Sequence, residues 1–220
     1  MIGEVIPAKV LTLRMIPNLS PGLAKSLRLN DRYRAIGLIS SDSDDVTYMA
    51  LDEATKVANV EVIYARSLYA GAANASTALA GEVIGILAGP TPSEVASGLR
   101  GAEAFIQSGV GFQKANEEGS VIYLAHCVSR TGSYLSEVAK IPQGQALAYL
   151  VAPPVEAVAA LDAALKASDV ELQQFFAPPT ETNFSGGLLT GTQSACQAAC
   201  EAFARTVKEI AARPKDLGGM

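Results

Sequence analysis

The sequence is short of the side chains that most enzymes use. It holds one histidine, His126, and three cysteines. A catalytic triad therefore has no other histidine to use as its base, and a metal site built from several histidines is impossible. Cys196 and Cys200 stand four residues apart on an expected helix and Cys127 stands alone, so we expect reduced, packed thiols. No catalytic residue, metal site or cofactor is predicted.

Charged residues are also scarce, at 18% against 49% hydrophobic residues. So little charge indicates that much of the surface is buried against other subunits. Long apolar runs are absent, because Gly, Pro, Ser or a charge interrupts every stretch before the roughly 20 residues of a membrane span. The N-terminus, Met1–Glu4, shows no basic segment followed by an apolar core. We expect a soluble protein that stays in the cytoplasm, with no membrane partner.

The net charge is −5 and the pI is near 5.0. This balance disfavours nucleic acid as a partner, because nonspecific binding depends on clustered Lys and Arg. Gly109–Gly111 and Gly186–Gly187 lack both the third glycine of a dinucleotide fingerprint and the lysine of a P-loop, so turns explain them. A small cationic ligand fits the charge better.

What the sequence does contain is an internal repeat. Residues 51–62 align without gaps on residues 161–172, at an offset of 110. Residues 86–89 align on 188–191 at an offset of 102, so the first copy carries eight more residues (110 − 102) in between. We place the boundary near 113–119 and divide the chain into a first domain, 1–113, and a second domain, 114–220.

Apolar runs, caps and turns give both halves the same order of elements. The expected strands are 8–16, 35–41, 60–66, 82–88, 121–129, 146–151, 171–176 and 187–190. The expected helices begin near Pro21 and Pro92 or span 46–58, 134–139, 155–167 and 193–212. Each half is thus an α/β unit with a sheet covered by helices on one side. Fused duplicates commonly replace two neighbours in a symmetric ring, so three chains would form a pseudo-hexamer.

An acidic cluster, Asp42, Asp44 and Asp45, lies where a strand gives way to a helix. Acids there favour the positive helix N-terminus, and capping is the simpler interpretation. Three acids exceed what a cap requires, however, and a bound cation would relieve their repulsion, with Glu82 as a fourth negative group. The spacing does not fit an EF-hand, so we expect an organic ammonium ion rather than calcium.

Two other features carry weaker interpretations. His126–Ser133 looks superficially like a cysteine phosphatase loop, but the arginine required six residues after Cys127 is a serine, so we expect a strand there. The loops 67–81 and 177–187 occupy equivalent places in the two halves. They are either plain surface connections or paired loops that meet around a symmetry axis.

Several long segments resemble the tandem-domain shell proteins of the ethanolamine-utilization microcompartment, and the resemblance covers almost the whole chain. They are Ile36–Tyr48, Ala65–Gly71, Val128–Leu135, Ala148–Pro154 and Pro179–Phe184. The resemblance implies two tandem, circularly permuted microcompartment domains of α/β (α+β, ferredoxin-like) fold. It also implies a homotrimer that tiles with other shell proteins into the bacterial microcompartment shell, within the cytoplasm.

Members of that family are described as closed, with small acidic pores, or open, with a large central pore that the loops 67–81 and 177–187 would form by rearranging. Ethanolamine bound at a small pore is thought to favour the closed form. The family's ligand positions correspond here to Asp44, Asp45, Glu82, Phe112, Thr182, Asn183 and Phe184. Two alternatives stay open: a shell tile for a diol or ethanol compartment, and a sensor or enzyme for small amines.

Overall fold

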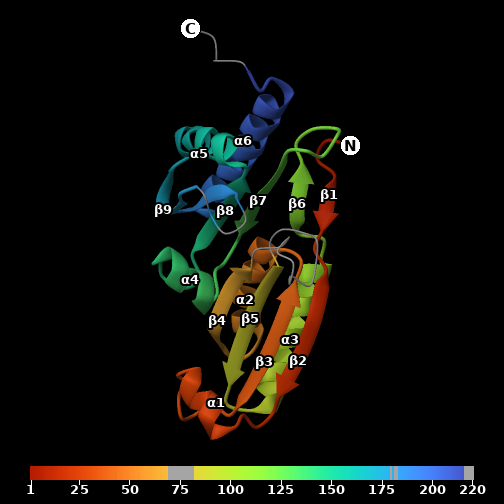
Figure 1. The fold of residues 1–220 in the computed structure, drawn as a ribbon. Coiled ribbons are helices and arrows are strands. Elements are labelled where there is room, and N and C mark those ends of the chain that lie inside the picture. The colour runs from red at the N-terminus through yellow and green to blue at the C-terminus, as the bar shows by residue number, and fades with distance from the viewer. Residues whose placement is uncertain (69–81, 179, 181–182, 216–220) are drawn as a thin grey trace. The chain divides into compact units, whose positions relative to one another are not determined.

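The computed structural model describes residues 1–68, 82–178, 180 and 183–215, without the side chains of Leu68 and Glu82 (Figure 1). The chain divides into two compact units, which we name by the strands that dominate them. The four-strand unit contains residues 7–110 and 132–137, and the six-strand unit contains residues 1–6, 111–131 and 138–220. The division of the sequence at 113/114 stays a prediction about the repeat.

The four-strand unit is an antiparallel sheet with helices on one face. Its strand order is β2 (Val10–Ile16), β3 (Ala35–Ser41), β5 (Glu82–Gly89) and β4 (Glu61–Leu68). The helices are α1 (Pro21–Ser26), α2 (Asp44–Val57) and α3 (Pro92–Gln107), of which α2 and α3 cover the sheet (Figure 1). The predicted elements of this half are therefore present, and α2 begins at Asp44, two residues before the expected start.

Two glycines allow α2 and α3 to approach this sheet closely. A Cβ atom on Gly85 would lie 2.7 Å from the side chain of Leu51, and one on Gly37 would lie 2.8 Å from that of Leu99. Leu51 is completely buried and Leu99 is nearly so. The helices thus pack where the strands offer no side chain, and the resulting apolar contact stabilises the unit.

The sequence Thr91-Pro-Ser-Glu94, a capping-box pattern, forms only part of that box in the structure. The Thr91 hydroxyl accepts a hydrogen bond from the Glu94 N–H (3.2 Å), and Pro92 opens α3. The Glu94 carboxylate, however, accepts from the N–H of Asn59 (2.7 Å), which follows α2. The side chain expected to complete a local cap instead ties α3 to the preceding connection.

The six-strand unit has the strand order β1 (Val5–Pro7), β6 (Gly111–Lys114), β7 (Ile122–Val128), β8 (Ala146–Ala152), β10 (Ser185–Gly191) and β9 (Val170–Phe176). Its helices are α5 (Pro154–Ala167) and α6 (Gln193–Ala212), and α4 (Ser133–Ala139) falls across the division between units. The short strands β1 and β6 were not predicted. The α/β fold, with two sheets that carry helices, is confirmed.

The cysteines lie where the packing prediction puts them. Cys196 and Cys200 on α6 are buried in a core that includes Phe203 and Leu150, and Cys127 on β7 is half-buried beside it. All three are free thiols. Among the described helices, none is both long and apolar enough to cross a membrane.

Candidate functional site

The acidic pair of the sequence opens helix α2 inside the four-strand unit. Asp44 and Asp45 are only 7% and 8% exposed. Ser43 precedes them at the N-cap with extended backbone, yet its side chain makes no capping bond, and its buried hydroxyl oxygen has no partner among the described residues. Two buried carboxylates and an unpaired hydroxyl at one helix start exceed what capping requires.

Asp42, the third acid of the cluster, has a different role. Its carboxylate accepts a hydrogen bond from the backbone N–H of Lys9 (2.6 Å), and the Asp42 N–H donates to the Lys9 carbonyl (3.1 Å). Asp42 therefore holds the segment that leads into β2. The cluster separates into one structural acid and the buried Asp44–Asp45 pair.

Hydroxyl groups fix the turn between β3 and α2. The Thr47 hydroxyl donates to the Ser43 carbonyl (2.8 Å) and contacts the Ser41 hydroxyl, which accepts from the Ser43 N–H (3.1 Å). Both Ser41 and Thr47 are fully buried. This arrangement makes the position of the acidic pair rigid, and no pattern in the sequence identified it.

The Asp44 carboxylate is held by neutral donors. The N–H of Asp45 donates to its Oδ1 (2.9 Å), and the hydroxyl of Ser67, near the end of β4, donates to its Oδ2 (2.7 Å). The hydroxyl of Tyr48 lies 2.6 Å from that of Ser67. These two donors satisfy oxygen lone pairs and carry no charge themselves.

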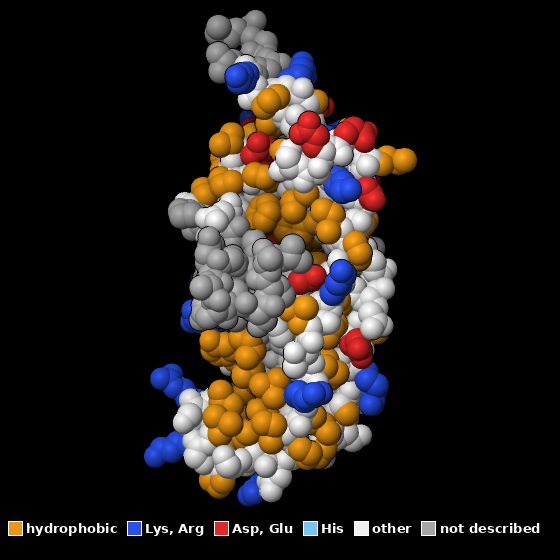
Figure 2. Space-filling model, turned by 45° about the vertical axis from the view of Figure 1, so that its right-hand side comes forward, with side chains coloured by type: hydrophobic (Ala, Val, Ile, Leu, Met, Phe, Trp, Pro, Cys, Tyr) orange, Lys and Arg blue, Asp and Glu red, His pale blue; other side chains and the backbone are white. Residues whose placement is uncertain are grey.

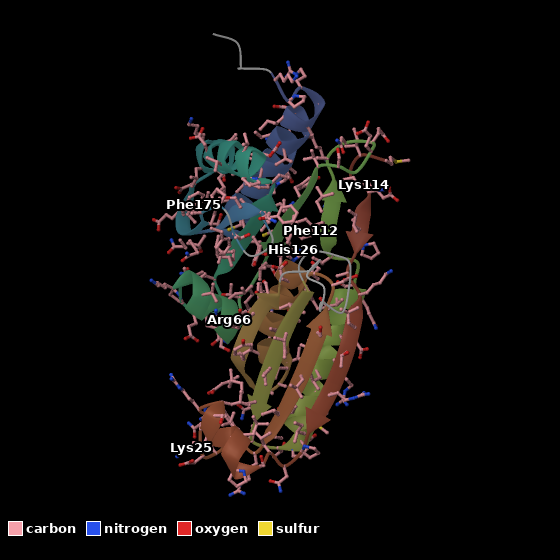
Figure 3. All side chains as sticks on the ribbon, viewed as in Figure 1. Lys25, Arg66, Phe112, Lys114, His126 and Phe175 are labelled. Atoms are coloured by element: carbon pink, nitrogen blue, oxygen red, sulfur yellow. The ribbon has the colours of Figure 1, made fainter. Side chains whose placement is uncertain are left out.

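Aromatic and loop residues of the predicted set lie in the six-strand unit. Phe112 on β6 (Figure 3) is 8% exposed. Its ring lies 5.2 Å from that of Phe184, measured between centroids. Asn183 adopts the left-handed conformation (φ 62°), which asparagine tolerates better than most residues, and its N–H donates to the Thr180 carbonyl (3.2 Å). The structure thus brings Phe112 and Phe184 together.

Two of the predicted residues are not described. Thr182 lies outside the described residues, and of Glu82 only the backbone, the first position of β5, is described. The acidic pair belongs to one unit and the Phe112–Phe184 pair to the other. A single site that includes all seven residues therefore stays a prediction.

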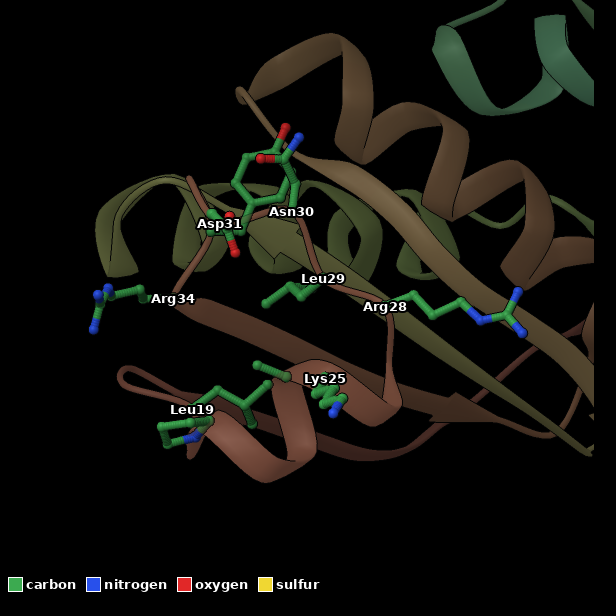
Figure 4. A pocket seen from close by; sticks show the side chains of 10 residues that line it. Leu19, Lys25, Arg28, Leu29, Asn30, Asp31 and Arg34 are labelled. Atoms are coloured by element: carbon green, nitrogen blue, oxygen red, sulfur yellow. The ribbon is translucent and has the colours of Figure 1, made fainter.

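A hollow of about 540 Å³ lies beside α1 and contains none of the predicted residues (Figure 4). It is lined by Leu19, Pro21, Ala24, Lys25, Arg28, Leu29, Asn30, Asp31, Tyr33 and Arg34. Three of these side chains are cationic, and those of Arg28 and Arg34 point away from one another. Such a lining repels an ammonium ion and does not converge on an anion.

The thiols show no sign of catalytic activation. His126 and Cys127 lie on β7, as predicted, and the phosphatase-loop interpretation is excluded by this extended backbone. Burial raises the pKa of Cys127, whereas a nucleophilic cysteine needs a lowered pKa. Within the described part of the chain, no group of three His, Cys, Asp or Glu side chains is placed to hold a metal ion.

Comparisons with known proteins identify the family of this chain. The sequence model of the BMC domain matches residues 35–115. The chain is 64% identical to bacterial microcompartment shell protein EutL of Clostridium perfringens, over 97% of this chain and 99% of that protein. It is 53% identical to EutL of Escherichia coli, over 96% of each.

A solved structure is similar over the whole length. The crystal structure of ethanolamine utilization protein EutL from Leptotrichia buccalis matches with a TM-score of 0.94 and 59% identity, covering 98% of this chain and 100% of that one. Identity at this level over almost the whole chain shows a shared fold. The chain therefore belongs to the EutL family of bacterial microcompartment shell proteins.

Proposed function

We propose that the chain forms a homotrimeric, pseudo-hexameric tile that binds ethanolamine at small acidic pores and carries a gated central pore. The observation that carries this proposal is the buried Asp44–Asp45 pair, because two adjacent carboxylates that are less than a tenth exposed concentrate negative charge, which favours binding of a cation. Protonated ethanolamine supplies such a cation in a molecule small enough for a narrow pore.

Membership of the family already gives the general role. The chain is a structural component of a microcompartment shell for ethanolamine utilization, inside the cytoplasm. We propose further that it has no catalytic activity of its own. The single histidine and the buried, high-pKa thiols support this view.

The chemistry of the proposed site follows from its residue types. Asp44, Asp45 and Glu82 would hold the ammonium group through charge-assisted hydrogen bonds. Phe112 and Phe184 would offer ring faces or backbone groups, and the Thr182–Phe184 segment would bind the alcohol end. An uncharged alcohol lacks the ammonium group, so ethanol or a diol would lose the main interaction.

Exposed apolar side chains support assembly with other subunits. Leu172 and Phe175 on β9 are each 43% exposed, and Val155 on α5 is 74% exposed. In the four-strand unit, hydrophobic side chains gather on the face that Figure 2 shows. Leu11 and Met15 of β2 are also exposed. Together with the low charge content, this surface fits a protein that buries much of itself against copies of itself and other shell proteins.

Gating would involve the loops 67–81 and 177–187. Residues 69–81 and part of the second loop lie outside the described residues. If ethanolamine binds the closed state more tightly, it shifts the equilibrium only by that difference in affinity. We therefore propose that the ethanolamine concentration changes the proportions of closed and open protein.

Sedimentation velocity tests the assembly part of the proposal. We expect one dominant species of about three times the 22.8 kDa chain mass, with flat sheets forming at high concentration. A protein that stays monomeric at all concentrations would contradict the tile. Calorimetric titration with ethanolamine, 1,2-propanediol and ethanol then identifies the ligand.

A further inference from the structure

We infer that Ser67 and Tyr48 are positioning residues for the cation site: they hold the Asp44 carboxylate in the orientation that receives the ammonium group. This inference rests on the proposed function, because it assigns a role in ethanolamine binding. Neither residue belongs to the predicted ligand set. Asp44, Tyr48 and Ser67 all lie in the four-strand unit.

The three groups form a chain of hydrogen bonds with one possible direction. An ionised carboxylate only accepts, so the single Ser67 proton goes to Asp44 Oδ2 (2.7 Å). The Ser67 oxygen then accepts from the Tyr48 hydroxyl (2.6 Å). Each bond polarises the next, which strengthens the donation to the buried carboxylate.

Helix α2 and strand β4 place the three hydrogen-bonding groups close together. Asp44 and Tyr48 stand one helical turn apart on α2 and therefore share a face. Ser67 is the penultimate residue of β4, in register with Val83 of β5. The ring of Tyr48 also lies 6.4 Å from that of Tyr134, between centroids, so aromatic packing holds the ring that carries the hydroxyl.

These hydrogen bonds explain how the buried Asp44 carboxylate can keep a fixed orientation for binding a cation. The N–H of Asp45 and the hydroxyl of Ser67 each satisfy one oxygen of Asp44, and neither carries a charge that an incoming ammonium group would have to displace. With both oxygens engaged, the carboxylate plane cannot turn freely. The ligand then meets a fixed anion and loses less free energy in ordering its partner.

Removing the Ser67 hydroxyl breaks both bonds at once. In Ser67→Ala, Asp44 Oδ2 loses its donor and the Tyr48 hydroxyl loses its acceptor. We expect ethanolamine affinity to fall about tenfold, the scale of one hydrogen bond to a charged group. In Tyr48→Phe only the polarising donor is lost, so we expect a fall of about two- to threefold. Ser67→Thr keeps the hydroxyl and should restore wild-type affinity.

The test is calorimetric titration of the purified full-length protein with ethanolamine. It compares wild type, S67A, S67T, Y48F and D44N, with S93A as a matched control that deletes an exposed serine hydroxyl on α3. Circular dichroism melting accompanies each titration. We expect S67A to lose about tenfold in affinity with a nearly unchanged melting temperature, S67T and S93A to match wild type, and Y48F to lie between.

The outcomes separate the inference from the proposed function. If wild type shows no binding, or D44N binds as well as wild type, the proposed site itself is wrong. If wild type binds and D44N does not, but S67A binds like wild type, only the positioning role is overturned. Failure of S67T to restore affinity also overturns it. If S67A does not fold, wild-type affinity in a folded Y48F would contradict the positioning role of the hydrogen bonds from Tyr48 to Ser67 and from Ser67 to Asp44.

Discussion

The carboxylate of Asp52 on α2 accepts a hydrogen bond from the backbone N–H of Leu135 on α4 (2.8 Å), although 83 residues separate them in the chain. It also accepts from the N–H of Gly132 (2.7 Å), and the hydroxyl of Thr55 accepts from the N–H of Ser133 (3.0 Å). The start of α4 is thus capped by α2 instead of by its own neighbours. The segment Gly132–Glu137 belongs to the four-strand unit for this reason.

Replacing Asp52 with alanine should destabilise the four-strand unit strongly. Asp52 is completely buried, so its removal leaves two buried N–H groups without acceptors. We expect a loss of about 2–4 kcal/mol in the free energy of unfolding, measured by chemical denaturation. Asp162→Ala is the control, because that carboxylate is exposed on α5 and pairs with Lys166 within its own helix. A loss below about 1 kcal/mol in Asp52→Ala would contradict the capping role.

The same carboxylate should give stability a defined pH dependence. Burial raises the pKa of Asp52 above its ordinary value of 3.8, and the donors Gly132 and Leu135 offset part of that rise. Between the unfolded and the raised folded pKa, the folded state binds more protons, so the stability that Asp52 contributes decreases as pH rises. The difference in free energy of unfolding between wild type and Asp52→Ala should therefore shrink as pH rises above the ordinary value of 3.8. A difference that grows over this range would show that the pKa is lowered.

Gly132 should tolerate no side chain. A Cβ atom there would collide with the Thr55 hydroxyl and lie 2.6 Å from the Asp52 backbone carbonyl. Gly132→Ala must push α4 away from α2, and we expect a loss of about 2–3 kcal/mol. Gly22→Ala on α1 is the matched control, since a Cβ atom there meets nothing within 4 Å. Equal melting temperatures for the two variants would contradict the close approach.

The thiols should be unreactive in the folded protein. Burial raises the pKa of Cys127, Cys196 and Cys200, and the last two are almost completely buried. With a thiol-exchange reagent, we expect slow reaction at Cys127 alone in the native protein and reaction of all three cysteines after denaturation. The Cys127→Ser variant should then show no native reaction. Rapid labelling of Cys196 or Cys200 would mean that α6 opens readily.

Sequence patterns predicted those features that depend on neighbouring residues. The Asp44–Asp45 pair was visible because acids accumulate where a strand meets a helix, and the start of α3 was visible from Thr91 and Pro92. Burial of Cys196 and Cys200 followed from the ordinary behaviour of free thiols. Each of these features depends on local periodicity or composition, which can be read directly from the sequence.

Long-range partners could not be predicted in this way. Ser67 lies 23 residues from Asp44, and nothing in its surroundings marks it as the donor to that carboxylate. Asp52 looks like an ordinary surface acid of an amphipathic helix that pairs with Lys56 one turn later, yet the N–H groups that it accepts from come 80 and 83 residues later. Such contacts are decided by how strands and helices pack, so one sequence without the fold does not reveal them.

Calorimetric titration of the purified protein with ethanolamine, for wild type and Asp45→Asn, measures directly whether the acidic pair binds the ligand. We predict saturable binding to wild type, at one site per chain, and no detectable heat with ethanol or 1,2-propanediol. The Asp45→Asn variant should lose at least about tenfold in affinity, because a neutral amide cannot balance the ammonium charge. Ethanolamine binding at the acidic pair is contradicted if the folded wild-type protein gives no heat with ethanolamine, or if Asp45→Asn binds it with unchanged affinity.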